Sequence, residues 1–175
     1  MKYELLFGEK IRLREMVDSD LELILDWENR PELDYLGDEH NPLTEAQISD
    51  FINHATGDIY TDGQLRLMID CAEETIGCID LFEFDQHNQR AGIGILIADI
   101  KNRKSGYAKE AVNILTNYCF DVLNFRQLYC HIPVDNEASV RLFSSCSFEE
   151  TGRCKDWVKK ENEFIDALFM QRLNG

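Results

Sequence analysis

The feature that most constrains this sequence is a short apolar run in mid-chain that leads through a basic segment into a long amphipathic pattern. Residues Ala91–Ala98 are almost continuously apolar, which is typical of a central strand covered on both faces. Residues 99–104 are polar and basic, and apolar side chains then recur at helical spacing over about Ser105–Val122. A buried strand that leads directly into a long helix predicts a domain of mixed α/β (α+β) class.

Periodicity and capping residues predict the other elements of one domain over residues 1–175. Helices are expected to begin at Asp18, at the capping box of Thr44 and Gln47, and at Asp135/Asn136. No repeat or linker interrupts the chain, so we expect a single mixed sheet with helices on both faces. The expected strands are Ile11–Arg14, Leu65–Asp70, Thr75–Phe84, Gln127–Ile132, Phe148–Asp156 and Phe164–Leu173, and the inward stripe of the long helix is Ala108, Ala111, Val112, Leu115, Cys119 and Val122.

The charge balance excludes one class of partner. The chain carries 33 acidic and 18 basic side chains, a formal net charge of −15, whereas nucleic-acid binding needs a basic face. The acidic excess lies in residues 1–100, which hold 23 acids and 7 bases, while residues 101–175 hold 10 and 11. Either these charges form an ordinary solvated surface, or the first part attracts a cation while the second tolerates an anion.

Membrane insertion, secretion and metal binding are not expected either. No apolar run approaches the roughly 18 residues of a membrane span, and the apolar core of residues 1–10 is too short for a signal peptide. We therefore expect a cytoplasmic protein without a membrane partner. The six cysteines form no CxxC pair and the four histidines no HxxxH pair, so we expect no metal site and reduced, mostly buried thiols.

The basic segment is the best candidate for a binding site. It lies between the buried strand and the helix start, where unpaired amides and the helix dipole favour an anion, and Gly106 lets a ligand approach the backbone closely. A solvated basic loop explains the same residues equally well. The segment is not a P-loop, because no GxxxxGK[ST] occurs, and Gly92-Ile93-Gly94 lacks the third glycine of a dinucleotide fingerprint.

An ordered set of motifs resembles the GNAT family of acetyl-CoA-dependent N-acetyltransferases over nearly the whole chain. The run from Arg103 to Ala108 matches the family motif R/Q-x-x-G-x-G/A, and residues 136–139 match its N-x-x-S segment. Residues 10–14, 146–148 and 162–166 are similar to its first strand, its L-G-F segment and its closing strand. Within the family, the spermidine and ribosomal-protein N-terminal acetyltransferases are most similar. The resemblance implies a mostly antiparallel sheet of about seven strands.

The resemblance also implies where the co-substrate acetyl-CoA would bind. Backbone groups of Leu96, Ile97 and Ala98 would meet the pantetheine arm where two parallel strands splay apart. Asn136 would hydrogen-bond the cofactor from the start of the next helix. The backbone amides that would cradle the pyrophosphate are those of Arg103, Lys104, Ser105, Gly106, Tyr107 and Ala108.

Acetyl transfer to an amine needs a base, because an ammonium with a pKa of about 10.4 has no lone pair with which to attack. Glu83 is the first candidate and Asp80 the second, on a strand expected to border the amine entrance, and both are also candidate substrate ligands. Strand alternation predicts that these two carboxylates lie on opposite faces or at different depths. The amide of Ile97 is the expected donor to the oxygen of the reacting thioester.

The proton donor to the leaving thiolate is the main departure from the family pattern. Polyamine enzymes carry a tyrosine where this chain has Phe143, which has no proton to donate. Ser139 is the expected substitute, and Ser144 and Tyr107 are weaker candidates. Two smaller departures are Gly92 in place of an acidic residue and Lys104 in place of a common glycine.

An acidic segment offers a place for a cationic acceptor. Residues 18–50 hold 11 acids against Arg30 alone, and Asp34, Asp38 and Glu39 lie in its expected loop, where they could receive several ammonium groups. The first expectation is a polyamine such as spermidine, and a protein N-terminus is the alternative. A non-catalytic sensor of acyl-CoA or polyamine is a further alternative, suggested by Phe143. The resemblance also implies a homo-oligomer.

Overall fold

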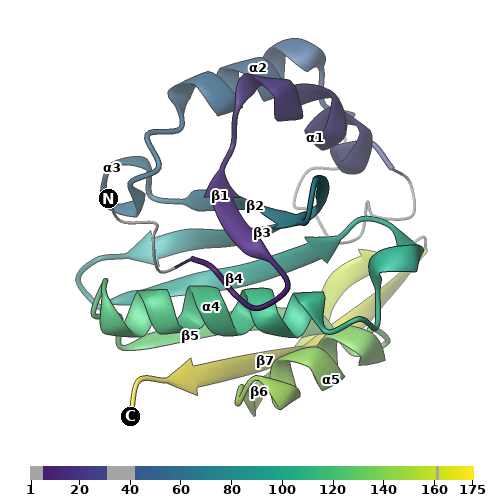
Figure 1. Cartoon of the computed structure of the whole chain (residues 1–175). Coiled ribbons are helices and arrows are strands. Elements are labelled where there is room, and N and C mark those ends of the chain that lie inside the picture. The colour runs from purple at the N-terminus through teal and green to yellow at the C-terminus, as the bar shows by residue number, and fades with distance from the viewer. Residues whose placement is uncertain (1–5, 31–41, 161) are drawn as a thin grey trace.

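The computed structural model describes residues 6–30, 42–160 and 162–175. These residues form one seven-stranded sheet with the strand order β1-β2-β3-β4-β5-β7-β6 (Figure 1). Neighbouring strands run antiparallel except β4 and β5, which are parallel, so the expected mixed, mostly antiparallel sheet is confirmed. The strands are β1 (Arg12–Glu15), β2 (Leu65–Cys71), β3 (Glu74–Asp85), β4 (Arg90–Ile97), β5 (Gln127–Pro133), β6 (Glu149–Lys160) and β7 (Glu163–Leu173).

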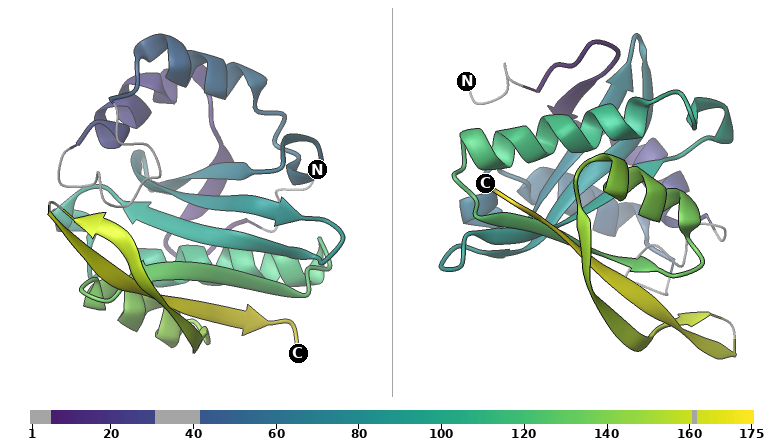
Figure 2. Two further views of the ribbon diagram at one scale, coloured as in Figure 1. Left: turned by 180° about the vertical axis from the view of Figure 1, so that it is seen from behind. Right: turned by 90° about the horizontal axis from the view of Figure 1, so that it is seen from below.

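Helices cover both faces of this sheet. Helices α1 and α2 lie on one face, and α4 and α5 lie on the other (Figure 1, Figure 2). None of the described helices is long and apolar enough to cross a bilayer. The α-helices are α1 (Leu21–Glu28), α2 (Glu45–His54), α3 (Ile59–Asp62), α4 (Tyr107–Asp121) and α5 (Glu137–Ser145), and short 3-10 turns at Asp18–Asp20 and Ile100–Asn102 precede α1 and α4.

Two apolar clusters pack against the two faces, and strand alternation divides the side chains between them. The larger cluster, on the α4 side, takes Leu67 and Ile69 from β2 and Ile93 from β4. The smaller cluster, under α1 and α2, takes Met68 from β2 and is packed by Leu96 of β4. β4 therefore has apolar contacts on both faces, which explains the continuous apolar run in its sequence.

β4 and β5 pair over a short distance and then separate. Their parallel pairing joins Arg90–Gly92 to Gln127–Tyr129. β4 continues to Ile97 and β5 to Pro133, and the described chain contains no further pairing between them. The two strands leave a fork that opens toward their carboxyl ends, and the loop to α4 leaves β4 at this open end. We refer to this gap as the fork.

Local capping sets the starts of two helices, as the sequence predicts. The Thr44 hydroxyl accepts from the Gln47 amide at 3.3 Å, and the Gln47 side chain accepts from the Thr44 amide at 2.9 Å. The Asn136 side chain caps α5 by accepting from the Ser139 amide at 3.1 Å. These bonds satisfy amides that a helix start otherwise leaves without a partner.

Three local expectations need correction. Asp18 does not cap the first helix, because it lies inside a 3-10 turn that begins after Val17, and the Val17 amide donates to the buried Asp20 carboxylate at 2.9 Å. Val122 is exposed, since α4 ends one residue earlier and Val122 only follows its last turn. The strand expected to stop at Asp156 continues to Lys160, where it still pairs with the last strand.

A buried carboxylate ties the β1 edge of the sheet together. Asp70 on β2 is 5% exposed, and Arg12, Arg14 and Thr75 each donate a hydrogen bond to it at 2.8 Å. Arg14 also binds Asp20 at 2.6 Å. Burial alone would raise the pKa of Asp70, but the hydrogen bonds from Arg14, Thr75 and Arg12 outweigh it and lower this pKa below its ordinary 3.8.

Candidate active site

The loop between β4 and α4 presents a row of backbone amides without partners. Gly106 is the N-cap of α4 with a φ of +86°, and no side chain caps the first turn. Within the described chain, the amides of residues 104–109 donate no hydrogen bond. They lie at the positive end of a 15-residue helix. An anion with several oxygens, such as a diphosphate, suits this row.

Arg103 does not belong to the row of free amides. Its amide donates to the Ile100 carbonyl oxygen at 3.0 Å within the 3-10 turn, which corrects the expectation that it joins the cradle. The Arg103 side chain donates instead to the Ile97 carbonyl oxygen at 3.1 Å, at the end of β4. Arg103 therefore holds the end of the strand in place.

Basic side chains surround the amides. Lys10 donates from Nζ to the Ser105 carbonyl oxygen at 3.2 Å, so its ammonium group lies next to Gly106. Lys101 is held by Glu74 at 2.8 Å. Lys104 makes no ion pair within the described chain and has a φ of +62°, the left-handed region that glycine adopts most easily. A glycine, as the resemblance leads one to expect at position 104, would adopt this conformation with less strain than Lys104.

The backbone of β4 alternates between β3 and the fork. The Ala98 amide donates to the Ile76 carbonyl oxygen at 3.0 Å, and Leu96 stands opposite Cys78 in the antiparallel register. Backbone groups of alternate residues in a strand point to opposite sides, so the Ile97 amide and carbonyl point into the fork. Of the three residues predicted to offer backbone groups there, Ile97 is the one so directed.

A β-bulge brings the two candidate bases to the same face of the sheet. The register of β3 against β4 shifts within Phe82–Asp85, and Glu83 in this bulge has a φ of +49°. The Asp80 carboxylate binds Arg66 on the face covered by α1 and α2. Glu83 reaches Tyr129 on that same face. Of the two arrangements expected for this pair, opposite faces or different depths, the structure excludes opposite faces, because the extra residue of the bulge compensates for the odd spacing.

Glu83 is available to a ligand, whereas Asp80 is not. Arg66 donates two hydrogen bonds to Asp80, at 2.7 and 3.0 Å, and also binds Glu28 at 2.5 Å. The Asp80 charge is therefore neutralised within the protein. Glu83 is exposed, and its Oε2 accepts a hydrogen bond from the Tyr129 hydroxyl at 2.7 Å. Its Oε1 makes no hydrogen bond within the described chain.

Sequence analysis missed two side chains next to Glu83. Tyr129 and His131 lie on β5 and face away from α4, since Leu128 and Cys130 belong to the core on the α4 side. The alternation within residues 127–132 carries this signal. Burial raises the pKa of Tyr129, and the hydrogen bond to Glu83 raises it further, so the hydroxyl keeps its proton at neutral pH.

Burial decides which residues of α5 can contact a ligand and which belong to the core. Phe143 is 3% exposed and packs edge-to-face on Phe148 with ring centroids 5.1 Å apart, so it is a core residue. Ser139 is half-buried in the first turn, and its hydroxyl makes no hydrogen bond within the described chain. Asn136 uses its oxygen to cap the helix, which leaves its amide nitrogen for a ligand.

The other candidate proton donors and the thiols are less suited to catalysis. Ser144 is exposed, and the interaction with the Cys71 thiol raises the pKa of Tyr107. All six cysteines are free thiols. Burial raises the pKa of Cys78 and of Cys130 to about 12, so these two remain protonated and unreactive.

The glycine at position 92 is explained by its neighbour in β3. A Cβ at Gly92 would lie 2.3 Å from the ring of Phe82, and the same ring comes within 3.5 Å of a Cβ built at Gly94. The ring occupies the space that a side chain at position 92 would need. An acidic residue could enter there only if Phe82 moved.

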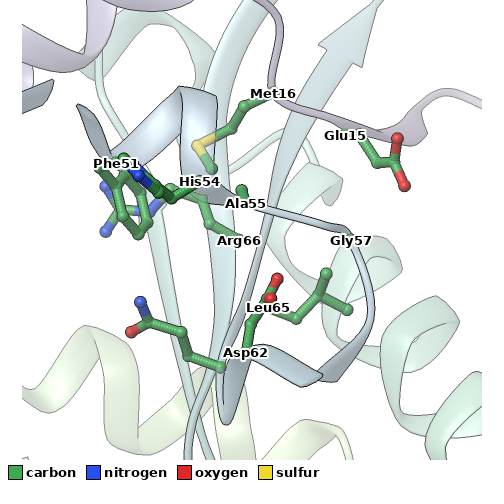
Figure 3. Close-up of a pocket in the computed structure, with 10 residues that line it drawn as sticks. Glu15, Met16, Phe51, His54, Ala55, Gly57, Asp62, Leu65 and Arg66 are labelled. Atoms are coloured by element: carbon green, nitrogen blue, oxygen red, sulfur yellow. The ribbon is translucent and has the colours of Figure 1, made fainter. Parts of the chain in front are cut away.

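The predicted cation-binding loop cannot be placed, since Asp34, Asp38 and Glu39 lie outside the described residues. A pocket of about 230 Å³ lies between α2 and β2 (Figure 3). Among the described residues, none of the predicted site residues lines it. Arg66 lines this pocket and also neutralises Asp80. This ion pair therefore connects the pocket to β3, the strand that carries both Asp80 and Glu83.

Comparison with known proteins gives a consistent picture. The family model described as "Acetyltransferase (GNAT) domain" matches residues 10–149. The uncharacterised N-acetyltransferase p20 of Bacillus licheniformis is 27% identical over 174 residues, which cover 97% of this chain and 96% of the relative. The spermidine N(1)-acetyltransferase of Vibrio cholerae is 30% identical over 95 residues, which cover 54% of each chain.

Solved structures share the fold. The spermidine N-acetyltransferase of Vibrio cholerae in complex with CoA and spermine superposes with a TM-score of 0.83 at 24% identity, covering 95% of this chain and 97% of that chain. A dodecameric structure of the Vibrio cholerae enzyme in an intermediate state gives a TM-score of 0.79 at 22% identity, covering 95% of both chains. At these identities the likeness shows the architecture alone.

Proposed function

The chain belongs to the GNAT family of acetyltransferases, and we propose that it transfers the acetyl group of acetyl-CoA to an amine of a polyamine such as spermidine. The family makes it an acetyl-transfer enzyme, whereas the polyamine is supported by the Vibrio cholerae relative and by the acidic residues 1–100. The observation that carries the proposal is the row of unpartnered amides at the start of α4, next to the fork.

The residues around the fork suit acetyl-CoA. The amides of residues 104–109 and the ammonium of Lys104 would hold the diphosphate. The Ile97 carbonyl oxygen, which also accepts from Arg103, has a second lone pair that would accept a hydrogen bond from the pantetheine arm. Ala98 and Arg103 support the end of β4, and Asn136 offers its amide nitrogen from the opposite side of the fork. Acetyl-CoA supplies the activated thioester when bound.

The side chains near the fork supply the proton transfers. Glu83 takes the proton of the acceptor ammonium, directly or through a water molecule. The amine nitrogen then bonds to the acyl carbon while the carbon–sulfur bond breaks, and the Ile97 amide stabilises the negative charge on the acyl oxygen. Ser139 gives a proton to the departing sulfur. Holding both substrates in the fork contributes much of the acceleration.

Substitution of Ser139 by alanine tests the proton donor. We expect Ser139→Ala to lower kcat about a hundredfold, because a general acid typically contributes at least this much, and to leave the affinity for acetyl-CoA nearly unchanged. The measurements are steady-state kinetics and calorimetry. Ser144→Ala, an exposed serine on the same helix, serves as the control. Unaltered turnover in Ser139→Ala would exclude this serine as the acid.

A thiol-release assay with spermidine, spermine and N-terminal peptides tests the acceptor. We expect turnover with the polyamines. Turnover with peptides alone would assign protein N-terminal acetylation instead. Tight acetyl-CoA binding without thiol release across a broad panel of amines would assign a sensor, the reading that the buried Phe143 favours. We also propose a homo-oligomer, by analogy with the dodecameric relative, and light scattering on the purified chain tests it.

A further inference from the structure

We propose that Tyr129 is a positioning residue, which holds the Glu83 carboxylate at the closed end of the fork so that one of its oxygens faces the acceptor ammonium. The proposal rests on the proposed acetyl transfer to an amine. Nothing in the family motifs points to position 129, and the assignment comes from the contacts around the β3 bulge. Those contacts fix the backbone of Glu83 and the ring of Tyr129, and they occupy one oxygen of the Glu83 carboxylate.

The backbone of Glu83 is held between two aromatic neighbours in the chain. Phe84 stacks on Phe125 with centroids 5.1 Å apart and an interplanar angle of 15°, in the core on the α4 side. Phe82 covers Gly92 on the opposite face. With both flanking rings anchored on opposite sides of the sheet, Glu83 adopts its φ of +49°, which a non-glycine residue rarely adopts. Such strain persists where the surroundings impose it, and it often marks functional sites.

The ring of Tyr129 is equally fixed. It is 8% exposed and contacts Phe169, with centroids 5.5 Å apart, and His131, with centroids 5.9 Å apart. Its backbone stands opposite Gly92 in the last β4–β5 pair before the fork. The hydroxyl therefore donates to Glu83 from a rigid position at the closed end of the fork. Only the hydroxyl proton is needed for this role, and the buried phenol keeps it.

One carboxylate oxygen is thereby left for the acceptor. Oε2 of Glu83 accepts the Tyr129 hydrogen bond, and Oε1 has no partner in the part of the chain that the structure describes. The titratable groups that face this pair are His131 on β5, and Arg90 and Asp85 at the adjoining ends of β4 and β3. Arg90 and Asp85 bind each other at 3.1 Å.

His131 does not take the place of the acceptor cation. Burial lowers the pKa of His131, although the nearby Glu83 charge works against this, so the ring favours its neutral form at neutral pH. Trp157 stacks on the His131 ring, with centroids 5.4 Å apart and an interplanar angle of 20°, and Trp157 itself is 58% exposed. Glu83 thus faces neutral aromatic groups on β5, and an incoming ammonium is its available counter-charge.

Tyr129→Phe removes the hydroxyl and keeps the ring, so it tests the proposal with little change in packing. We expect kcat/KM for the acceptor amine to fall about tenfold, since a hydrogen bond to a charged group is lost, while the KM for acetyl-CoA stays unchanged. The acid limb of the pH profile of kcat/KM should move to higher pH, because the charged carboxylate loses a donor that favours it. A merely structural role would not move this limb.

Two further variants complete the test. Tyr118→Phe makes the same chemical change at a buried tyrosine of α4, and its pH profile should match that of the unmodified chain. In a Glu83→Gln background, adding Tyr129→Phe should have almost no further effect, because the two residues act through one contact. Independent, additive losses in the double variant would overturn the proposal, as would an unshifted acid limb in Tyr129→Phe.

The outcome is separable from that of the proposed function. If peptides are the acceptors, the same shift is expected with peptides, and only the polyamine assignment fails. If no amine is acetylated, calorimetry of spermidine with the CoA-loaded chain replaces kinetics. A severalfold weaker affinity in Tyr129→Phe than in Tyr118→Phe then supports the proposal, and equal affinities, or no binding to the unmodified chain, overturn it.

Discussion

Gly77 lies in β3 opposite Ile97, and a Cβ built there would stand 1.9 Å from the backbone oxygen of Leu96. The obstructing atom is backbone, so the strand itself must move. We expect Gly77→Ala to destabilise the fold by about 2 kcal/mol, in line with other overpacked sites, and to weaken CoA binding severalfold because the end of β4 is displaced. Chemical denaturation and calorimetry measure both effects.

A glycine on the facing strand provides the control for this prediction. A Cβ at Gly94 meets nothing nearer than the Phe82 ring at 3.5 Å, which is ordinary contact. We expect Gly94→Ala to change the free energy of unfolding by less than about 1 kcal/mol. If the two variants prove equally stable, β4 accommodates a Cβ at position 77 without cost, and the prediction fails.

Asp70 gives the fold a predictable response to acid. Its pKa is lowered in the folded chain, so its stabilising contribution is complete above the unfolded value of about 3.8 and is lost as the pH falls through the lower folded value. We expect Asp70→Asn to cost about 2–3 kcal/mol at pH 7, because it breaks a buried ion pair with Arg12 and Arg14. Denaturation between pH 2.5 and 7, about the range in which carboxylates titrate, provides the measurement.

The shape of that pH dependence distinguishes the explanation. The stability of Asp70→Asn should fall less steeply below pH 4 than that of the unmodified chain, since one titrating carboxylate is missing. Asp85→Asn removes a partly exposed carboxylate whose pKa is also lowered, chiefly by hydrogen bonds from Asn88, and should change stability little. Parallel acid limbs for Asp70→Asn and the unmodified chain would contradict this account.

At the scale of single elements, the start of α4 is the part that a cofactor should alter most. We expect coenzyme A to slow hydrogen exchange of the amides of residues 104–109 at least tenfold, because they have no acceptor in the described chain. The Arg103 amide already donates to Ile100 and should change little. Exchange measured by NMR separates these positions. Protection confined to other helices would place the ligand elsewhere.

The sequence predicts most elements because each has a local cause. The apolar run of β4, the Thr44 capping box and the Asn136 cap are all visible over a few residues. The β3 bulge is different: no glycine or proline marks it, and it depends on Phe82 and Phe84 finding places on opposite faces. The sequence therefore leaves open whether Glu83 and Asp80 share a face, because the answer depends on these distant partners.

The candidate site was predictable to the extent that backbone position determines it. The amides before α4 follow from a strand, a loop and a helix in sequence. Side-chain partners did not follow, since the contacts of Arg66 with Asp80 and of Tyr129 with Glu83 join residues 14 and 46 positions apart. Local patterns carry no information about such pairs beyond the face on which each residue lies.

At the scale of the whole molecule, the net charge of −15 should appear in kinetics. We expect kcat/KM for spermidine to fall severalfold between about 0.05 and 0.3 M NaCl, since salt screens the attraction of a multiply charged cation over distances beyond about 10 Å. N-acetylputrescine carries a single ammonium and should respond less. Equal salt dependence of the two acceptors would mean that the overall field plays no part in acceptor binding.

β4 and β5 are joined by three residue pairs, which is fewer than for any other two neighbouring strands of the described sheet. A force that pulls β5, β6 and β7 away from β1 to β4 would therefore act mainly on the pairing of β4 with β5. A molecule that binds in the fork and forms hydrogen bonds with both β4 and β5 reinforces this weak connection. The enzyme should therefore be stiffest with its co-substrate in place, and most compliant between turnovers.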